Sequence, residues 1–235
     1  MAPFRYAGML GLIAFAVCAG ASPIAYATTA SGESAASGET ATMQRIVDTF
    51  ERIVTRVYQT SGHGVRGAHA KGQGCVHATV RVAANVAPPL RHGVFAAPKT
   101  YRAWIRFSNG AGEIRADGVP DGRGMAIKLT GVPGPKLIDD ERQTQDFVMI
   151  NFPAFFISDV AQYEVLANAI ERNQLPAFLA AHPKSAKLAA QIGGVPTHDL
   201  LRNNYFSMTP YLLGSTYLKF GAFPASCTTG AELTP

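Results

Sequence analysis

The sequence predicts an α+β protein in which a run of short antiparallel strands precedes a set of helices. Apolar and polar residues alternate in the middle of the chain, for example from Val76 to Val82, which is typical of strands with one buried face. Turn-forming residues such as Asn109–Gly110 and Pro133–Gly134–Pro135 separate these stretches. After Phe156 the apolar residues recur at helical spacing instead. Strands that precede helices, rather than alternating with them, favour an antiparallel sheet.

Composition bounds the class of protein. The chain has 235 residues, enough for one large domain or two small ones. Hydrophobic residues make up 47% and charged residues 16%, which excludes a highly charged, disordered chain. The formal net charge is +5, and the basic residues are scattered rather than gathered in a run. We therefore expect no nucleic-acid partner.

Residues 1–27 are typical of a secretory signal peptide. A short segment ending in Arg5 precedes an apolar run over 6–21, and Ala25–Tyr26–Ala27 fits a small-x-small cleavage site. The apolar run is shorter than the about 20 residues of a membrane-spanning helix. We expect cleavage after Ala27, export to the periplasm or the medium, and no stable membrane association afterwards. An uncleaved N-terminal anchor is the alternative.

The segment that follows divides into a linker and a helix. Residues 28–42 are rich in Ser, Thr, Gly and Ala without apolar periodicity, which predicts a flexible linker. Apolar residues then follow helical spacing from Met43 to Tyr58, with Thr42 as the expected N-cap and Gly62 as the stop. We expect residues 43–235 to form one domain.

The remaining elements follow from the same patterns. Strands are expected at 76–82, 103–107, 124–129 and 147–150, with one further strand within 211–223. Helices are expected at 159–170, from Pro176, and from Pro183 to Gly193–Gly194.

Cysteine and histidine spacing gives no metal site. Cleavage after Ala27 would leave Cys75 and Cys227, whose pairing the sequence leaves open. His69 and His77 share one face of a strand, but the eight residues between them correspond to roughly 26 Å at about 3.3 Å per residue. We therefore predict no metal-binding cluster of side chains.

Four segments carry a resemblance to a known family. They are RGAHAKGQG (66–74), WIRFSNGAG (104–112), PDGRGMAIKL (120–129) and FVMINFPAFFISD (147–159). In this order and at these separations they resemble the haem-side segments of the catalase family. NYFSMTPYLLG, at 204–214, is similar to the shorter catalase-related haem proteins. The resemblance implies a catalase-like antiparallel β-barrel, with its N-terminal half present and helices after the fourth strand.

The resemblance also implies haem-dependent decomposition of hydrogen peroxide, a catalase- or peroxidase-type oxidoreductase activity used against oxidative stress. His69 would then move a proton between the two peroxide oxygens, which suits a group with a pKa near neutrality. Ser108 would hydrogen-bond the other ring nitrogen of His69, and Asn151 would position the peroxide.

The same resemblance assigns residues to the cofactor. Arg66 and Arg106 would pair with the haem propionates, because a planar guanidinium binds a carboxylate in two places. Phe155, Phe156 and Tyr163 would pack on or near the porphyrin. Asp121 and Arg123 would be structural, fixing the turn into the third strand.

Two departures from the family pattern bear on activity. Many catalases have two consecutive Asn residues where this chain has Ile150–Asn151, so Asn151 would supply the amide only through a shift of the strand. No segment after Gly214 resembles the R-x-x-x-Y segment that carries the iron-binding Tyr, which indicates a relative truncated at the C-terminus. The alternatives to an enzyme are a non-enzymatic haem binder and an inactive relative. An open half-barrel also favours self-association into a homo-oligomer.

Overall fold

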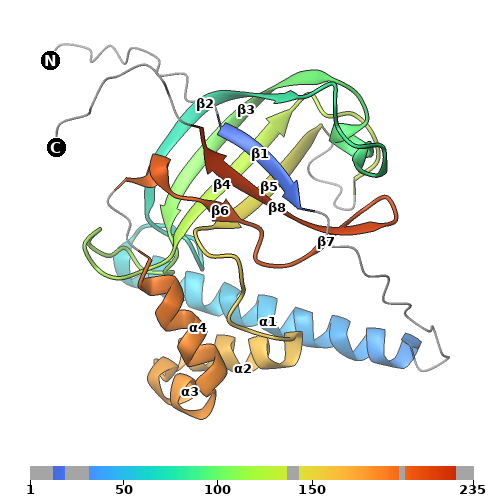
Figure 1. The fold of residues 1–235 in the computed structure, drawn as a ribbon. Coiled ribbons are helices and arrows are strands. Elements are labelled where there is room, and N and C mark those ends of the chain that lie inside the picture. The colour runs from blue at the N-terminus through green and yellow to red at the C-terminus, as the bar shows by residue number, and fades with distance from the viewer. Residues whose placement is uncertain (1–12, 19–31, 137–142, 196–198, 226–235) are drawn as a thin grey trace, which may run out of the picture.

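A computed structural model describes residues 13–18, 32–136, 143–195 and 199–225. One antiparallel sheet curves around a core, and the longer helices gather at one end of it (Figure 1). None of the helices in the described ranges combines the length and the apolar character of a membrane-spanning segment.

The sheet is antiparallel at every pairing, in the order β1-β8-β6-β5-β4-β3-β2, with β7 paired to β8 outside this path. Its strands are β1 Ile13–Cys18, β2 Gly72–Val82, β3 Lys99–Asn109, β4 Arg123–Thr130, β5 Thr144–Ile150, β6 Tyr205–Phe206, β7 Tyr211–Leu213 and β8 Thr216–Pro224. The helices are α1 Gly32–Ser61, α2 Val160–Glu171, α3 Leu175–Ala181 and α4 Pro183–Gly193. The predicted α+β class, with helices after the fourth predicted strand, is confirmed.

The four strands expected in the middle of the chain correspond to β2, β3, β4 and β5. The further strand expected within 211–223 is a hairpin instead, in which β7 turns back into β8. Gly214 lies at this turn with φ of 59°, a backbone conformation that glycine adopts without steric cost. The turn divides what the apolar pattern alone presents as one segment.

The core lies on the inner face of the curved sheet. Alternate residues of a strand point to opposite faces, and on β3 the buried set is Tyr101, Ala103, Ile105 and Phe107. Ile127 and Leu129 of β4 and Met149 of β5 complete the centre of this core and are each 1% exposed. The outer face is therefore free to carry other chemistry.

The helices pack against one another at the end of the sheet (Figure 1). α2 begins at the N-cap Asp159, whose carboxylate accepts a hydrogen bond from Gln162 N at 2.8 Å. α1 is bound to α2 by ion pairs from Arg45 to Glu164 and from Arg52 to Glu171. These pairs join the two helices along the exposed side of their contact.

Two expectations for the N-terminal region change. The predicted linker is wrong over residues 32–42, because α1 begins at Gly32, and Thr42 is an interior residue whose hydroxyl donates to Gly38 O at 3.0 Å. This stretch has Ala and Glu residues and no proline, so nothing in it breaks the helix. Within the expected signal peptide, residues 13–18 form β1 along β8. Residues 1–12 and 19–31, with the cleavage site, lie outside the described residues.

Candidate functional site

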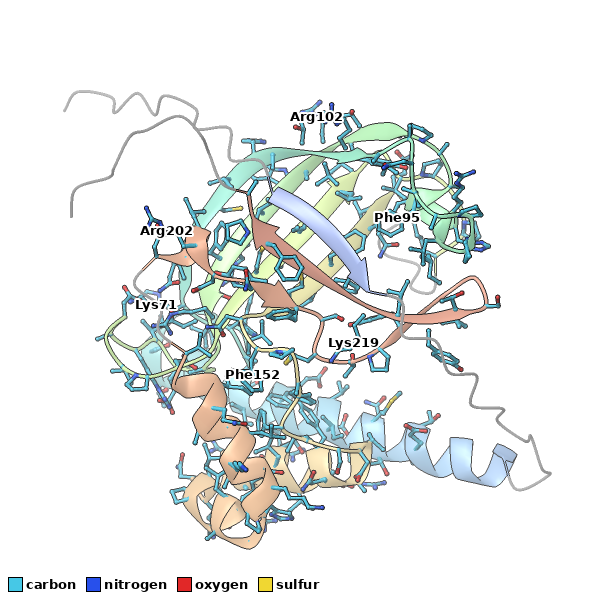
Figure 2. The ribbon with its side chains drawn as sticks, in the orientation of Figure 1. Lys71, Phe95, Arg102, Phe152, Arg202 and Lys219 are labelled. Atoms are coloured by element: carbon cyan, nitrogen blue, oxygen red, sulfur yellow. The ribbon has the colours of Figure 1, made fainter. Side chains whose placement is uncertain are left out.

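His69 lies in the segment between α1 and β2, at the end of the sheet that faces the helices. Figure 2 shows Lys71 and Phe152 at this end, whereas Arg102 lies at the opposite end. The His69 backbone has a φ of 55°, in the left-handed region that residues with a side chain rarely adopt. Its amide donates to Gly110 O at 3.1 Å, and its carbonyl accepts from Arg106 Nη2 at 2.9 Å. The main chain is therefore held on both sides of the imidazole.

The imidazole packs against the outer face of the sheet. His69 Nδ1 lies 3.1 Å from Ser108 Oγ, so the structure brings together the two residues that the resemblance pairs. Gly124 lies opposite Ser108 on β4, and a Cβ there would lie 2.6 Å from Nδ1 and 2.7 Å from Ser108 Oγ. Glycine is thus required beneath the ring, a role that sequence reasoning missed because Gly124 reads only as a strand residue.

The surroundings lower the pKa of His69 below its usual 6.5. Burial is the main cause, since it disfavours the charged imidazolium. The charges of Arg106 and Arg66 lower the pKa further, whereas a hydrogen bond to the Asn109 backbone and the charge of Asp121 raise it. The imidazole is consequently neutral at neutral pH and can accept a proton.

Ile150, rather than Asn151, lies on the same face of the sheet as His69. A Cβ on Gly122 would lie 2.8 Å from Ile150 Cδ1, and Gly124, two residues further on and hence on the same face, lies under His69. This placement corrects the expected position of Asn151, because a shift of one residue moves a side chain to the opposite face.

Asn151 instead ties the end of β5 to β4. Its side-chain Oδ1 accepts a hydrogen bond from the Arg123 backbone N at 2.9 Å, and its backbone N donates to Arg123 O at 2.9 Å. Its side-chain Nδ2 is buried and has no hydrogen-bond partner among the described residues. Arg123, only 2% exposed, donates to Asp117 O at 2.7 Å and so fixes the turn, as expected for a structural residue.

A cavity of about 660 Å³, widely open to solvent, lies between α1, α2 and the His69 segment. Its lining residues are Ile46, Val47, Phe50, Glu51, Val54, Thr55, Gly67, Ala68 and Tyr163. The wall contributed by α1 was not predicted, because its helical periodicity indicates only that the face is apolar. Phe50 lies against Gly67, and its ring centroid is 6.2 Å from that of Tyr163 in a tilted arrangement, so Phe50 joins the α1 wall to α2.

Of the expected aromatic residues, Tyr163 lines this cavity, and Phe155 and Phe156 pack beside Tyr163 without lining it. The ring centroids of Phe155 and Phe156 lie 5.2 Å apart, and those of Phe155 and Tyr163 lie 5.9 Å apart. All three rings pack against a small apolar cluster that includes Ile157 and Leu166. Burial raises the pKa of the Tyr163 phenol, so this ring is neutral at ordinary pH.

Two guanidinium groups lie close to His69. Burial and the charge of Arg66 lower the pKa of Arg106, which shows that the two cations are near each other. No carboxylate forms an ion pair with either of them in the described part of the chain. Arg106 uses its Nη2 to donate a hydrogen bond to His69 O, and the Arg66 side chain is exposed. The pair can receive an anionic group.

Metal-binding side chains do not cluster in the described residues, where no group of three or more His, Cys, Asp or Glu could hold an ion. Cys75 is exposed and free on β2. Cys227 lies outside the described residues, so the question of its pairing stays open.

One of the comparisons with known proteins, the match to a family model, agrees with the motifs. A family model described as Catalase matches residues 49–181, more than half of the chain. No curated protein sequence matches the chain. Among solved structures, a crystal structure of a fungal catalase is similar, with a TM-score of 0.46 and 22% identity over 67% of this chain. The chain spans 32% of that fungal catalase. On the family match, this chain belongs to the catalase family.

Proposed function

We propose that the chain binds haem in the cavity beside His69 and decomposes hydrogen peroxide there. The observation that carries the proposal is the His69–Ser108 pair, seated over Gly124 and next to a 660 Å³ cavity, in a chain of the catalase family. Such a pair provides a proton-transferring group with a fixed ring orientation.

The residues around the cavity fit the cofactor. Its volume lies within the about 300–1,000 Å³ of small-molecule and cofactor sites, and most of its lining is apolar, as a porphyrin requires. Arg66 and Arg106 supply two cations of the kind that bind carboxylates, such as the propionates of haem. When bound, haem would supply the redox chemistry of its iron.

His69 would handle the proton of the peroxide. With its own proton on Nδ1, the ring donates to Ser108 Oγ and leaves Nε2 open to accept a proton. Its lowered pKa keeps Nε2 unprotonated at neutral pH, as a base requires. Tyr163, which lines the cavity, and Phe155, which packs against Tyr163, would exclude water from that wall.

A second function is favoured by Ile150. An isoleucine side chain cannot donate a hydrogen bond, so Ile150 cannot supply the amide that would hold peroxide beside His69. The alternative is a haem binder without peroxide turnover, and the two functions separate in one experiment.

The experiment is a haemin titration of the full chain, of His69→Ala and of the matched control His77→Ala. His77 is an exposed histidine on β2, and its ring is tilted against that of Trp104 on β3, with the ring centroids 3.5 Å apart. We expect saturable haemin absorbance in all three proteins and peroxide consumption that falls about 100-fold or more only in His69→Ala. Binding without turnover in the parent chain supports the haem binder. Absence of saturable binding, or unchanged turnover in His69→Ala, contradicts the catalytic proposal.

Export and self-association belong to the same proposal. Cleavage after Ala27 would remove β1 and expose the edge of β8, and exposed edges promote association between chains. We propose an exported protein that forms homo-oligomers. N-terminal sequencing of the secreted product and light scattering of the purified protein test the two statements, and an uncleaved monomer would contradict both.

A further inference from the structure

The backbone of residues 67–70 runs directly beside that of residues 110–112. His69 N donates to Gly110 O at 3.1 Å, and Ala70 N donates to Ala111 O at 3.0 Å. A Cβ on Gly112 would lie only 2.3 Å from Gly67 O, so the two segments lie too close for any side chain at position 112. The position of the His69 backbone therefore depends on the position of residues 110–112.

Asp121 fixes that neighbouring segment from the other side. Its Oδ2 accepts from Gly110 N at 3.1 Å and from Ala111 N at 3.0 Å. Gly110 N also donates to Gly122 O at 2.8 Å, so Gly110 has a second anchor. Asp121 is the acceptor that the structure gives to Ala111 N, which makes the Ala70–Ala111 bond the one most dependent on this carboxylate.

The left-handed conformation of His69 needs such support. A residue with a side chain keeps a positive φ only where its surroundings over-determine it. Arg106 binds the carbonyl side of His69, and the Gly110–Ala111 segment binds the amide side. Asp121 therefore supports the amide side of His69 through the Gly110–Ala111 segment and not through a hydrogen bond to the imidazole.

Asp121 is also the acidic group that acts on the ring. The charged groups that influence His69 are Asp121, ahead of β4, Arg106 on β3 and Arg66 in its own segment. From α1, Glu51 lies in the wall of the neighbouring cavity. The carboxylate of Asp121 opposes the two guanidinium groups, because its negative charge favours the protonated imidazole whereas theirs disfavour it.

We propose that Asp121 is a positioning residue for His69, which holds the His69 main chain through the Gly110–Ala111 segment and balances the charges of Arg66 and Arg106 around the imidazole. The proposal rests on the proposed function only for its consequence in turnover. Both of its readouts come from the chain without haem, so a failure to bind haemin would leave them interpretable.

The test compares Asp121→Ala and Asp121→Asn with the parent chain by NMR of the full chain. In Asp121→Ala we expect amide exchange at Ala70 to accelerate about tenfold, with a smaller change at His69, because Gly110 keeps its bond to Gly122. The Asn109 amide, which donates to Lys71 O at 3.1 Å, serves as the internal control and should not change.

Asp121→Asn separates charge from geometry. Its amide oxygen retains an acceptor, so protection at Ala70 should largely survive, whereas the pKa of His69 should fall further once the negative charge is gone. The matched control is Asp117→Asn. Asp117 is an acid at the same end of the sheet that pairs with Lys71 at 2.8 Å, and its loss should leave the His69 pKa unchanged.

Three results overturn the proposal. Unchanged amide exchange at Ala70 in Asp121→Ala would show that Asp121 does not hold the His69 main chain. An unchanged His69 pKa in Asp121→Asn would show that the charge of Asp121 does not act on the imidazole. An equal fall in the His69 pKa in Asp117→Asn shows that the effect is not specific to Asp121. If Asp121→Ala does not fold, the pKa in Asp121→Asn decides.

Discussion

The two faces of β3 are built from alternate residues of one strand and bear different kinds of interaction. The inner face carries Ala103, Ile105 and Phe107, which are buried among apolar neighbours of the core. The outer face carries Arg106 and Ser108, which bind the backbone and the ring of His69. One strand thus supports the core with every second residue, and at its C-terminal end it supports the candidate site with Arg106 and Ser108.

The difference between the faces lies in what each tolerates. Apolar packing is non-directional, so the inner face depends on volume and burial. The outer face holds His69 through hydrogen bonds and through the close approach of Gly124 to the imidazole. Its interactions therefore require particular distances and directions. We therefore expect changes on the inner face to lower stability and changes at the end of the outer face to alter His69 first.

The largest effect on stability is expected from Ile127→Ala on the inner face of β4. Ile127 is 1% exposed at the centre of the core, and such a truncation should lower the free energy of unfolding by about 2–5 kcal/mol. The matched control is Val148→Ala on the outer face of β5, where the side chain is 53% exposed and the change should stay within about 0.5 kcal/mol. Denaturant unfolding measures both. Equal losses in the two variants would contradict the distinction between the faces.

Gly124→Ala tests the close approach beneath His69. The new Cβ would overlap the imidazole and Ser108 Oγ, and we expect a loss of about 1–3 kcal/mol together with separation of His69 from Ser108. Gly74→Ala is the control, because nothing lies within 4 Å of a Cβ at that position. Denaturant unfolding gives the energy and NMR of the imidazole gives the geometry. An unaltered imidazole in Gly124→Ala would refute the requirement for glycine.

Ser108→Ala tests the hydrogen bond to the ring. Its loss should lower the free energy of unfolding by about 0.5–1.5 kcal/mol and mix the two imidazole tautomers, which nitrogen chemical shifts report. Ser185→Ala removes another buried hydroxyl, one that accepts from Gln162 Nε2 at 3.3 Å, and should cost a similar amount without changing the tautomer. A tautomer that is the same in both variants and the parent would exclude a role for Ser108 in orienting His69.

Many of the strands and helices could be predicted because the patterns that indicate them involve residues close together in the sequence. Strand alternation and helical spacing are properties of neighbouring residues, and they locate β2, β3, β4 and β5 as well as α2. The hairpin of β7 and β8 was predicted as one strand because its turn is only two residues long, Gly214 and Ser215, within an otherwise largely apolar stretch. The start of α1 was missed because Ser, Thr and Gly weaken the helical pattern without ending the helix.

The candidate site could be predicted in part only. The motifs place Ser108 against His69, and the structure has them at 3.1 Å. The orientation of Asn151 could not be predicted, because a one-residue difference in register exchanges the faces of a strand. The bond from Arg106 to His69 O and the cavity wall from Phe50 join segments far apart in sequence, so no local pattern contains them.

The smallest effect expected is a dependence of stability on pH that comes from His69. Burial lowers the pKa of this imidazole in the folded chain below the 6.5 of an exposed histidine. Well above pH 6.5 the imidazole is neutral in both the folded and the unfolded chain, so His69 does not make the free energy of unfolding depend on pH. As the pH falls below 6.5, the unfolded chain takes up a proton that the folded chain does not, so the free energy of unfolding decreases.

Denaturant unfolding of the parent chain and of His69→Gln, at pH values from about 8 to about 5, isolates this contribution. Glutamine cannot titrate, so the variant should lose less stability on acidification than the parent chain, while the two curves run parallel above about pH 7.5. Parallel curves over the whole range would mean that His69 has the same pKa in both states. The outer face of the sheet would then hold the imidazole without burying its charge, and the contrast between the two faces of β3 would be one of geometry alone.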